Sequence, residues 1–218
     1  MSRKRLSAVN AADLTLVPLR PTGRDLDEVA AVAARAFHID PFFEWLEPGE
    51  LRRARALGLF FRTMIRNAGP GVEVTGARRA DGRLVGVAVW VAPSKFPPPV
   101  AAQVRSLLGS GWALALRPER LVPGTRYVAA LDRAHPREPM WYLQVLATDP
   151  IAQRRGVGAT LLGPGHERAD REGLDCWLET QKEDNIVYYR RFGWEVAGEL
   201  RPVSGGPPLW TMRRPSRH

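Results

Sequence analysis

The sequence contains very little cysteine and lysine. Cys176 is the single cysteine in 218 residues, which excludes an internal disulfide and favours a reducing compartment. We therefore expect a cytoplasmic protein. Lysine occurs only at positions 4, 95 and 182, so the net charge of +9 comes almost entirely from arginine.

Long apolar runs are also missing. The longest, Leu84 to Ala92, is far shorter than the roughly 20 residues that cross a bilayer, so we expect no membrane span. The basic residues near the N-terminus are not followed by an apolar stretch, which argues against a signal peptide. Residues 1–12 are expected to form a flexible arm, and residues 13–218 a single domain.

Two classes of partner are disfavoured by the placement of charged residues and histidines. The positive charge is spread along the chain without a block of five or more basic residues, so a nucleic-acid partner is not expected. The four histidines, at positions 38, 135, 166 and 218, lack the spacing of metal ligands. We therefore predict no metal site.

Hydrophobic periodicity and turn residues predict the elements of the first half of the chain. These are a strand at 14–20, a helix at 22–37 capped by Thr22, an aromatic-rich loop at 38–48, a helix at 50–67, a β-hairpin of Val72–Arg78 and Leu84–Val91, and helices at 100–116 and 119–135. The last helix is expected to break at Pro123–Gly124, because proline removes a helical hydrogen bond.

The second half has a more regular pattern. It predicts strands at 141–148, 174–179, 194–200 and 209–213, with helices at 156–172 and 186–192. A strand–helix–strand order favours parallel pairing of the first two strands. Pro164 inside the first helix predicts a kink or a different boundary. The fold class is therefore α/β, built around one mixed sheet.

The most informative stretch is residues 153–158, Gln-Arg-Arg-Gly-Val-Gly, which follows a predicted strand and opens a predicted helix. Two glycines allow a tight turn and close approach of a ligand to the backbone. A helix N-terminus carries unpaired N–H groups and partial positive charge, so it binds phosphate or pyrophosphate. The loop lacks the Gly-Lys-Ser/Thr ending of nucleoside-triphosphate sites and the pattern of dinucleotide folds.

Together with the preceding Leu-Ala-Thr-Asp-Pro at 146–150, this loop resembles the acetyl-CoA pyrophosphate loop of the GNAT acetyltransferases. Residues 185–194, Asn-Ile-Val-Tyr-Tyr-Arg-Arg-Phe-Gly-Trp, resemble that family's second motif, N-x-x-x-Y-x-x-x-G-F/W. The resemblance implies the GNAT fold, a central mixed sheet flanked by helices, with acetyl-CoA as cosubstrate. It also implies a possible homodimer, because members of the family are often dimers.

The resemblance assigns roles to residues within a cofactor-binding core at about 140–200. It places the pantetheine arm on Leu146, Ala147 and Thr148, and the pyrophosphate on Gln153, Arg154, Arg155, Gly156, Val157, Gly158 and Ala159. Asn185 and Tyr189 are expected to contact the cofactor as well.

Acetyl transfer needs an acid for the leaving thiolate and a base for the amine. Tyr189 matches the family's general acid, and a tyrosine hydroxyl stays protonated at neutral pH; core packing of the ring is the alternative. Glu179, at the end of a predicted strand, is our candidate base, with Glu138 and Glu44 as alternatives. Gln144 lies where some family members carry a glutamate base, so a water relay is also possible.

The acceptor is less defined than the cofactor. Residues 135–215 are similar to the puromycin N-acetyltransferase branch of the family, which implies direct transfer, within a ternary complex, to a primary amine of an aminonucleoside- or antibiotic-like small molecule. The alternatives are a protein or peptide acceptor, and an acetyl-CoA-binding regulator without catalysis. Cys176 has no histidine near it in the sequence, so no acetyl-enzyme is expected. Aromatic residues that either line an acceptor pocket or pack in the core are Phe42, Phe43, Trp45 and Trp112.

Overall fold

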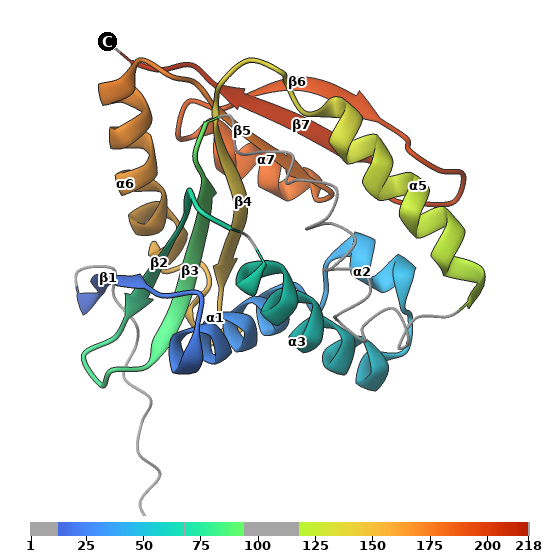
Figure 1. Ribbon diagram of the computed structural model, residues 1–218, viewed down its shortest axis with the longest axis horizontal. Coiled ribbons are helices and arrows are strands. Elements are labelled where there is room, and N and C mark those ends of the chain that lie inside the picture. Colours follow the sequence, from blue (N-terminus) through green and yellow to red (C-terminus); the bar gives the residue numbers. More distant parts are fainter. Residues whose placement is uncertain (1–12, 68, 94–117, 218) are drawn as a thin grey trace, which may run out of the picture.

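The computed structural model describes residues 13–67, 69–93 and 118–217 (Figure 1). The strands are β1 (Thr15–Leu19), β2 (Val72–Arg78), β3 (Leu84–Val91), β4 (Trp141–Thr148), β5 (Cys176–Thr180), β6 (Glu195–Leu200) and β7 (Leu209–Arg214). The helices are α1 (Gly23–Ala36), α2 (Pro41–Leu46), α3 (Glu50–Arg66), α5 (Pro118–Ala134), α6 (Val157–Glu172) and α7 (Glu183–Arg190). The predictions for residues 1–12 and 100–116 lie outside the described residues.

The strands form one seven-stranded sheet in the order β1-β2-β3-β4-β5-β7-β6. The β2–β3 hairpin is antiparallel, as its turn chemistry predicts. β4 and β5 are parallel, with α6 crossing between them. The predicted mixed α/β sheet is therefore confirmed. Within the described ranges, every helix is too short or too polar to cross a membrane.

Each face of the sheet carries its own hydrophobic core. On one face, side chains of α6 and α7 pack on the sheet around Trp90, Leu143 and Trp194. On the other, α1 and α3 pack around Val89 and Val145. Burying each of these large side chains contributes roughly 1.5–3 kcal/mol, so the two cores hold the sheet between its helices.

β4 changes face at an extra residue in its middle. Val145 pairs with Val89 and Leu143 pairs with Trp90, so Gln144 is a bulge without a partner on β3. Because a one-residue slip reverses the alternation of side chains, Leu143 packs in the core beneath α6 whereas Val145 packs in the core beneath α1. Because of the bulge, the core side chains of the two halves of β4 point to opposite faces of the sheet.

β4 and β5 are paired over a short stretch only. Trp141 pairs with Cys176 and Tyr142 pairs with Trp177, and the ladder contains no further pair. Among the described strands, none therefore lies beside the second half of β4, from the bulge to Thr148, on the β5 side. Its backbone groups on that edge are available to an extended ligand.

Helix α6 runs through Pro164 close to its predicted bounds and lies tightly against β3. Gly165 lies against the indole of Trp90, and a β-carbon there would stand 2.2 Å from the ring. The helix ends at Gly173, a left-handed C-cap with φ 64°. The close approach that Gly165 allows holds α6 on the sheet, together with residues 153–158, which we call the phosphate loop after the role that the sequence predicts for them.

Three local expectations were wrong. Residues 41–46 form a helix rather than a loop, because Asp40 caps it by accepting from the backbone N–H of Phe42 at 3.0 Å. α5 runs through Pro123 without a break, and Tyr127, one turn further along the helix, is fully buried against α2 and β7. Thr22 occupies the N-cap of α1, but its side chain makes no capping hydrogen bond.

Candidate active site

A buried carboxylate fixes the start of the phosphate loop, where β4 ends. Asp149 is 1% exposed, and its Oδ2 accepts hydrogen bonds from Nε and Nη2 of Arg35 at 3.0 and 2.8 Å. Arg83 lies 3.6 Å from the same oxygen. The Oδ1 atom accepts from the backbone N–H of Ile151 at 3.2 Å. The loop is therefore anchored to α1 and to the β2–β3 turn.

The loop then turns through two left-handed residues, Arg154 with φ 59° and Gly156 with φ 83°. For arginine this conformation costs on the order of 1 kcal/mol, and such strain gathers at ligand sites. The side chain of Gln153 braces the turn by donating to the carbonyl of Thr148 at 3.2 Å. Arg154 and its neighbour Arg155 are both exposed.

The first turn of α6 leaves its backbone N–H groups open. The first helical hydrogen bond runs from the N–H of Thr160 to the carbonyl of Gly156 at 3.0 Å. The N–H groups of residues 157–159 come before it and have no partner inside the helix. The side chain of Val157 is 1% exposed and packs in the core. The loop and helix start therefore have the backbone geometry of an anion site, and the phosphate site at these residues stays a prediction.

Helix α7 brings two tyrosines to this region. The hydroxyl of Tyr188 is buried without a hydrogen-bond partner in the described structure, and burial raises the pKa of Tyr188 to about 12. It faces Gly158, where a β-carbon would stand 2.5 Å from the hydroxyl oxygen. Asn185 donates to Oγ1 of Thr180 at 2.8 Å, so it ties the first turn of α7 to the end of β5.

Tyr189 is 8% exposed and belongs to the core beneath α6. Burial raises its pKa well above the ordinary value, which keeps the hydroxyl protonated at neutral pH. Its ring packs on Trp194 at 5.8 Å between centroids, and the Trp194 indole donates to Nε2 of His166 at 3.1 Å. Burial lowers the pKa of His166 to about 4, so His166 is a neutral acceptor near pH 7.

Glu179 lies on β5 at the point where the strands separate. Continuing the β4–β5 register two residues past Tyr142 and Trp177 places it level with Gln144, the bulge residue. The side-chain oxygen of Gln144 is buried without a hydrogen-bond partner in the described structure. This position is next to the open edge of β4.

The Glu179 side chain is only 5% exposed and has a dense set of neighbours. Its Oε1 accepts from the indole N–H of Trp177 at 2.6 Å and lies 3.6 Å from Nδ1 of His135. The hydroxyl of Tyr142 also hydrogen-bonds this carboxylate, and burial together with that charge raises the pKa of Tyr142 well above its usual range.

The other candidate bases lie elsewhere. Glu138 is exposed and lines an open concavity of about 540 Å³ at the start of β4 and β5, the opposite end of β4 from the phosphate loop. Glu44 is exposed on α2 and lies 3.7 Å from Arg53. Cys176 is fully buried, and burial raises its pKa to about 12, so it is no nucleophile.

Within the described residues, the aromatic side chains of α2 pack against other rings of the core, and Phe43 also lines a small concavity between α2 and α3. Phe42 stacks on Tyr127 at 4.7 Å and Trp45 lies 6.0 Å from the same ring. Phe43 packs on Phe60 at 5.3 Å. Trp112 lies outside the described residues.

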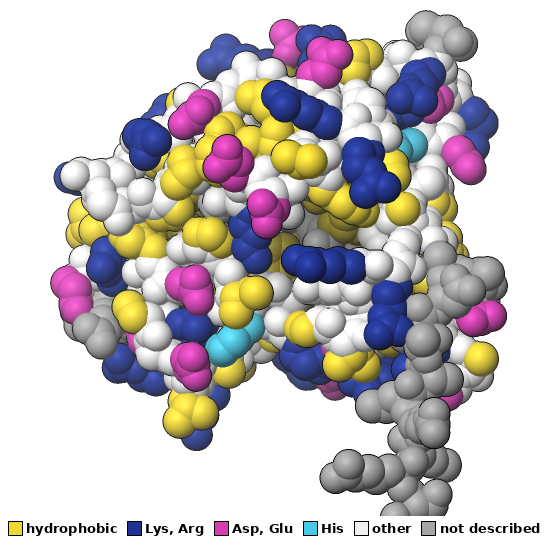
Figure 2. Space-filling model, turned by 180° about the vertical axis from the view of Figure 1, so that it is seen from behind, with side chains coloured by type: hydrophobic (Ala, Val, Ile, Leu, Met, Phe, Trp, Pro, Cys, Tyr) yellow, Lys and Arg dark blue, Asp and Glu magenta, His cyan; other side chains and the backbone are white. Residues whose placement is uncertain are grey.

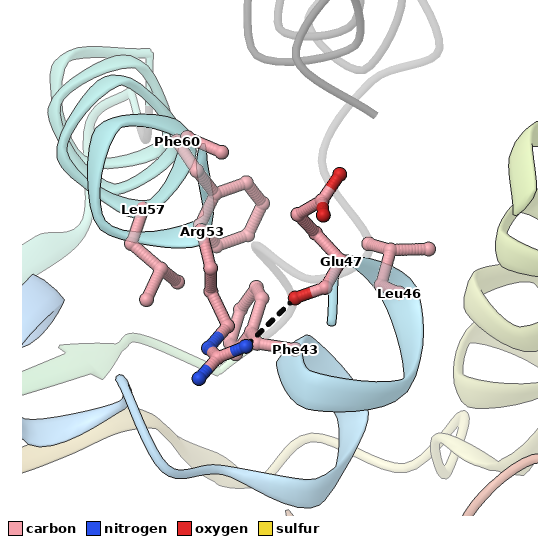
Figure 3. A pocket seen from close by; sticks show the side chains of 7 residues that line it. Phe43, Leu46, Glu47, Arg53, Leu57 and Phe60 are labelled. Carbon is pink, nitrogen blue, oxygen red and sulfur yellow. Dashed lines mark hydrogen bonds between the residues drawn. The ribbon is translucent and has the colours of Figure 1, made fainter. Parts of the chain in front are cut away.

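The concavity between α2 and α3 is small (Figure 3). Its volume of about 10 Å³ has room for one water molecule. Arg53, 4% exposed, donates from Nη1 to the carbonyl of Glu47 at 2.9 Å (Figure 3). Its Nε donates to the carbonyl of His38 at 2.7 Å. This arginine therefore clamps α2 onto α3.

Figure 2 shows a hollow near the middle of the face turned away in Figure 1. Hydrophobic side chains lie inside it, and Lys and Arg side chains stand around its edge. Such a surface suits a ligand with an anionic part and an apolar part. Across the described part of the chain, no three His, Cys, Asp or Glu side chains gather closely enough to hold a metal ion.

Sequence reasoning missed two groups that shape this site. The anchoring role of Asp149 has a local signal, since an aspartate followed by proline is a common start of a helical turn. The cluster of His135, Tyr142 and Trp177 around Glu179 has no such signal, because its members come from the residue after α5, from β4 and from β5. Only the packing of these elements brings them together.

The comparisons with known proteins agree with this geometry. The model of the acetyltransferase (GNAT) family matches residues 35–194. A curated relative, acetyltransferase Atu2258 of Agrobacterium fabrum, is 28% identical over 75 residues, which are 34% of this chain. The chain spans 55%, about half, of the length of that relative.

Solved structures extend the similarity over nearly the whole chain. A structure from Corynebacterium glutamicum, described as histone acetyltransferase HPA2 and related acetyltransferase, is 26% identical with a TM-score of 0.67, covering 94% of this chain and 98% of that one. The PaiA N-acetyltransferase of Thermoplasma acidophilum, in complex with coenzyme A, is 14% identical with a TM-score of 0.54, covering 93% and 98%. The second likeness concerns the fold alone.

Proposed function

This chain belongs to the GNAT acetyltransferase family, and we propose that it transfers an acetyl group from acetyl-CoA to a primary amine of a small molecule. Transfer is direct, within a ternary complex. The observation that carries the proposal is the open N-terminus of α6, which lies at the end of β4 beside the edge that β5 leaves uncovered. An anion site and an unpaired strand edge suit a pyrophosphate with an amide-bearing arm.

The residues of the loop fit this cosubstrate. The N–H groups of Val157, Gly158 and Ala159 point a positive dipole at the pyrophosphate, and the exposed Arg154 and Arg155 add charge. Leu146, Ala147 and Thr148 present strand hydrogen bonds to the pantetheine arm, with Gln153 and Asn185 bracing the two ends of this region. Acetyl-CoA, when bound, supplies an acetyl group activated as a thioester.

Tyr189 and Glu179 supply the proton chemistry. Glu179 accepts the proton that the acceptor ammonium must lose before its nitrogen can attack. Tyr189, whose hydroxyl stays protonated because it is buried, donates a proton to the sulfur that leaves. General acid and base catalysis each contribute typically 10²–10⁴-fold to the rate.

The enclosure of Glu179 supports a small acceptor. The carboxylate is 5% exposed and His135 beside it is 6% exposed, so an amine that approaches them must be narrow. The similarity of residues 135–215 to the puromycin N-acetyltransferase branch supports an aminonucleoside- or antibiotic-like amine. The Corynebacterium structure, described as a histone acetyltransferase and relative, favours a second candidate, a lysine or N-terminal amine of a protein.

Thiol release from acetyl-CoA tests the proposal. The purified protein is assayed with puromycin, phenethylamine, spermidine, a lysine peptide and a peptide with a free N-terminal alanine. We expect release that depends on one of the small amines. Release with a peptide alone would move the function to the second candidate. Binding of acetyl-CoA without release for any amine would contradict catalysis and favour a regulatory role.

A further inference from the structure

One buried hydrogen-bond acceptor at the bulge of β4 has no donor. The side-chain oxygen Oε1 of Gln144 is shielded from water, and no group in the described part of the chain donates a hydrogen bond to it. A buried amide oxygen in this state has lost its hydrogen bonds to water without replacing them, which destabilises the folded protein. A ligand that donates a hydrogen bond to this oxygen would account for it.

The bulge determines the face of the sheet on which this side chain lies. Leu143 and Leu146 both pack in the core beneath α6, although side chains three residues apart in a regular strand point to opposite faces. The two residues between them, Gln144 and Val145, therefore both lie on the other face. Val145 packs there in the core beneath α1. Gln144 thus shares the α1 face of β4 with Val145.

Glu179 lies on the same face of the sheet. Leu178, the residue before it on β5, belongs to the core beneath α6, so the alternation of side chains turns Glu179 to the opposite face. The β4–β5 ladder ends at Tyr142 and Trp177, and its register continued by two residues places Glu179 level with Gln144. The two strands therefore present an amide oxygen and a carboxylate on one face, just beyond the end of their ladder.

We propose that Oε1 of Gln144 accepts a hydrogen bond from the acceptor amine, orients its nitrogen for attack and selects for primary amines. This inference rests on the proposed function and deepens it. Leu146, the first residue that we propose for the pantetheine arm, follows Gln144 by two residues, roughly 7 Å along the strand. A nitrogen that attacks the thioester and gives a proton to Glu179 therefore has to pass close to Gln144.

The three N–H bonds of a primary ammonium have three different fates in this arrangement. Glu179 takes the first proton, and the electron pair of that bond stays on nitrogen. The nitrogen then bonds to the acetyl carbon, the carbon–sulfur bond breaks, and sulfur leaves with the proton of Tyr189. The second ammonium proton restores the Tyr189 hydroxyl, and Glu179 releases its proton to solvent. The third N–H stays in the amide product.

Gln144 accepts from this third N–H throughout the reaction. The hydrogen bond turns the lone pair of nitrogen away from the amide oxygen and toward the acetyl carbon. It also stabilises the positive charge that grows on nitrogen during attack. A secondary amine has only two protons on its ammonium, and both must leave, so it lacks the N–H that Gln144 retains. A site built to hydrogen-bond one N–H discriminates against an analogue without it.

The kinetic test compares Gln144→Met with wild type, using the panel amine that wild type acetylates fastest and the N-methyl derivative of that amine. Methionine is unbranched like glutamine but is only a weak acceptor. We expect kcat/KM for the primary amine to fall about 10- to 100-fold, mainly through KM of the amine. The preference for the primary amine over its N-methyl derivative should shrink by a similar factor, and the dissociation constant of acetyl-CoA should stay within twofold.

A second measurement needs no substrate. Gln144→Met removes an acceptor that has no donor, so the urea midpoint of the ligand-free variant should rise above that of wild type. Gln181→Met is the matched control, because the side chain of Gln181 hydrogen-bonds Tyr127, and its midpoint should fall. A lower midpoint for Gln144→Met would show that the oxygen already has a donor in the free protein, and would overturn the inference.

The kinetic outcomes separate this inference from the proposed function. Wild-type turnover that Gln144→Met retains within threefold overturns the inference and leaves the proposed function standing. A loss confined to the affinity for acetyl-CoA also overturns it, because Gln144 would then serve the cosubstrate. If wild type releases no thiol with any amine, the proposed function fails, and the inference fails with it.

Discussion

The hydroxyl of Tyr188 lies directly against Gly158, so that a β-carbon at position 158 would stand 2.5 Å from the hydroxyl oxygen. The contact joins α7 to the first turn of α6, where the N–H groups of the phosphate loop are open. Leu146 of β4 is the next neighbour, at 3.7 Å from the same point. The second glycine of the loop is therefore required by a tyrosine, independently of the pyrophosphate that we propose it binds.

Gly158→Ala should weaken acetyl-CoA binding, because the new methyl group displaces either Tyr188 or the start of α6. Overpacking of this kind costs typically 1–3 kcal/mol, which corresponds to about 5- to 150-fold in the dissociation constant if the cost falls on the bound state. Isothermal titration calorimetry with acetyl-CoA measures the change. The double variant Gly158→Ala, Tyr188→Phe should recover most of the affinity, since phenylalanine lacks the oxygen that collides. An equal loss of acetyl-CoA affinity in the single and double variants would mean that the collision with the Tyr188 hydroxyl is not the cause.

Tyr189→Phe should lower kcat by about 10²-fold or more while the dissociation constant of acetyl-CoA stays nearly unchanged. The hydroxyl is the group that we propose as the proton donor, whereas the ring packs on Trp194 and would keep that contact. Steady-state kinetics with the best panel amine, beside calorimetry, makes the comparison. Tyr188→Phe distinguishes the two hydroxyls. Full turnover in Tyr189→Phe would remove this residue from the chemistry.

Short-range signals predicted the parts of the fold that depend on neighbours in sequence. The β2–β3 hairpin and the strand–loop–helix at 141–172 follow from alternation, turn residues and the glycines of the phosphate loop. The exceptions depend on tertiary contacts. α5 keeps its helical form across Pro123 because Tyr127 is buried against Phe42 and β7, and no local pattern reports that contact.

The candidate site also has one part that local sequence signals predict and another that depends on tertiary packing. The loop at 153–158 could be read as an anion site because backbone amides and glycines act locally. The neighbours of Glu179 could not be predicted, since they come from three elements whose packing the sequence does not reveal. The bulge at Gln144 could not be predicted either, because the extra residue can be recognised only when the residues of β4 are paired with those of β3.

Gly165→Ala should destabilise the protein, although alanine is the better helix former. A β-carbon at position 165 would stand 2.2 Å from the indole of Trp90, so α6 must move or the ring must shift, at a cost of roughly 1–3 kcal/mol. Gly58→Ala, in helix α3 with nothing within 4 Å of its β-carbon, is the matched control and should stabilise by about 0.5–1 kcal/mol. Urea denaturation measures both. Two variants that change stability in the same direction would refute the packing argument.

Asp40→Asn should stabilise the protein above pH 6 and have little effect below about pH 4. Burial raises the pKa of Asp40 to about 6, against the opposing charge of Lys182 and the backbone N–H of Phe42. The folded pKa lies above the unfolded value of 3.8, so the folded state binds the proton more tightly. The stability that this group contributes is complete below about pH 4 and is lost as pH rises through 6.

Asparagine reproduces the protonated carboxyl and keeps an oxygen to cap α2, which Asp40 caps through the N–H of Phe42 at 3.0 Å. The gain in the free energy of unfolding should therefore reach about 1–3 kcal/mol at pH 7.5 and vanish at pH 4, as measured by urea denaturation. Asp40→Ala loses the cap, so its free energy of unfolding should lie about 1 kcal/mol below that of Asp40→Asn at both pH values. A gain for Asp40→Asn that is equal at the two pH values would mean that burial of the charge is not its source.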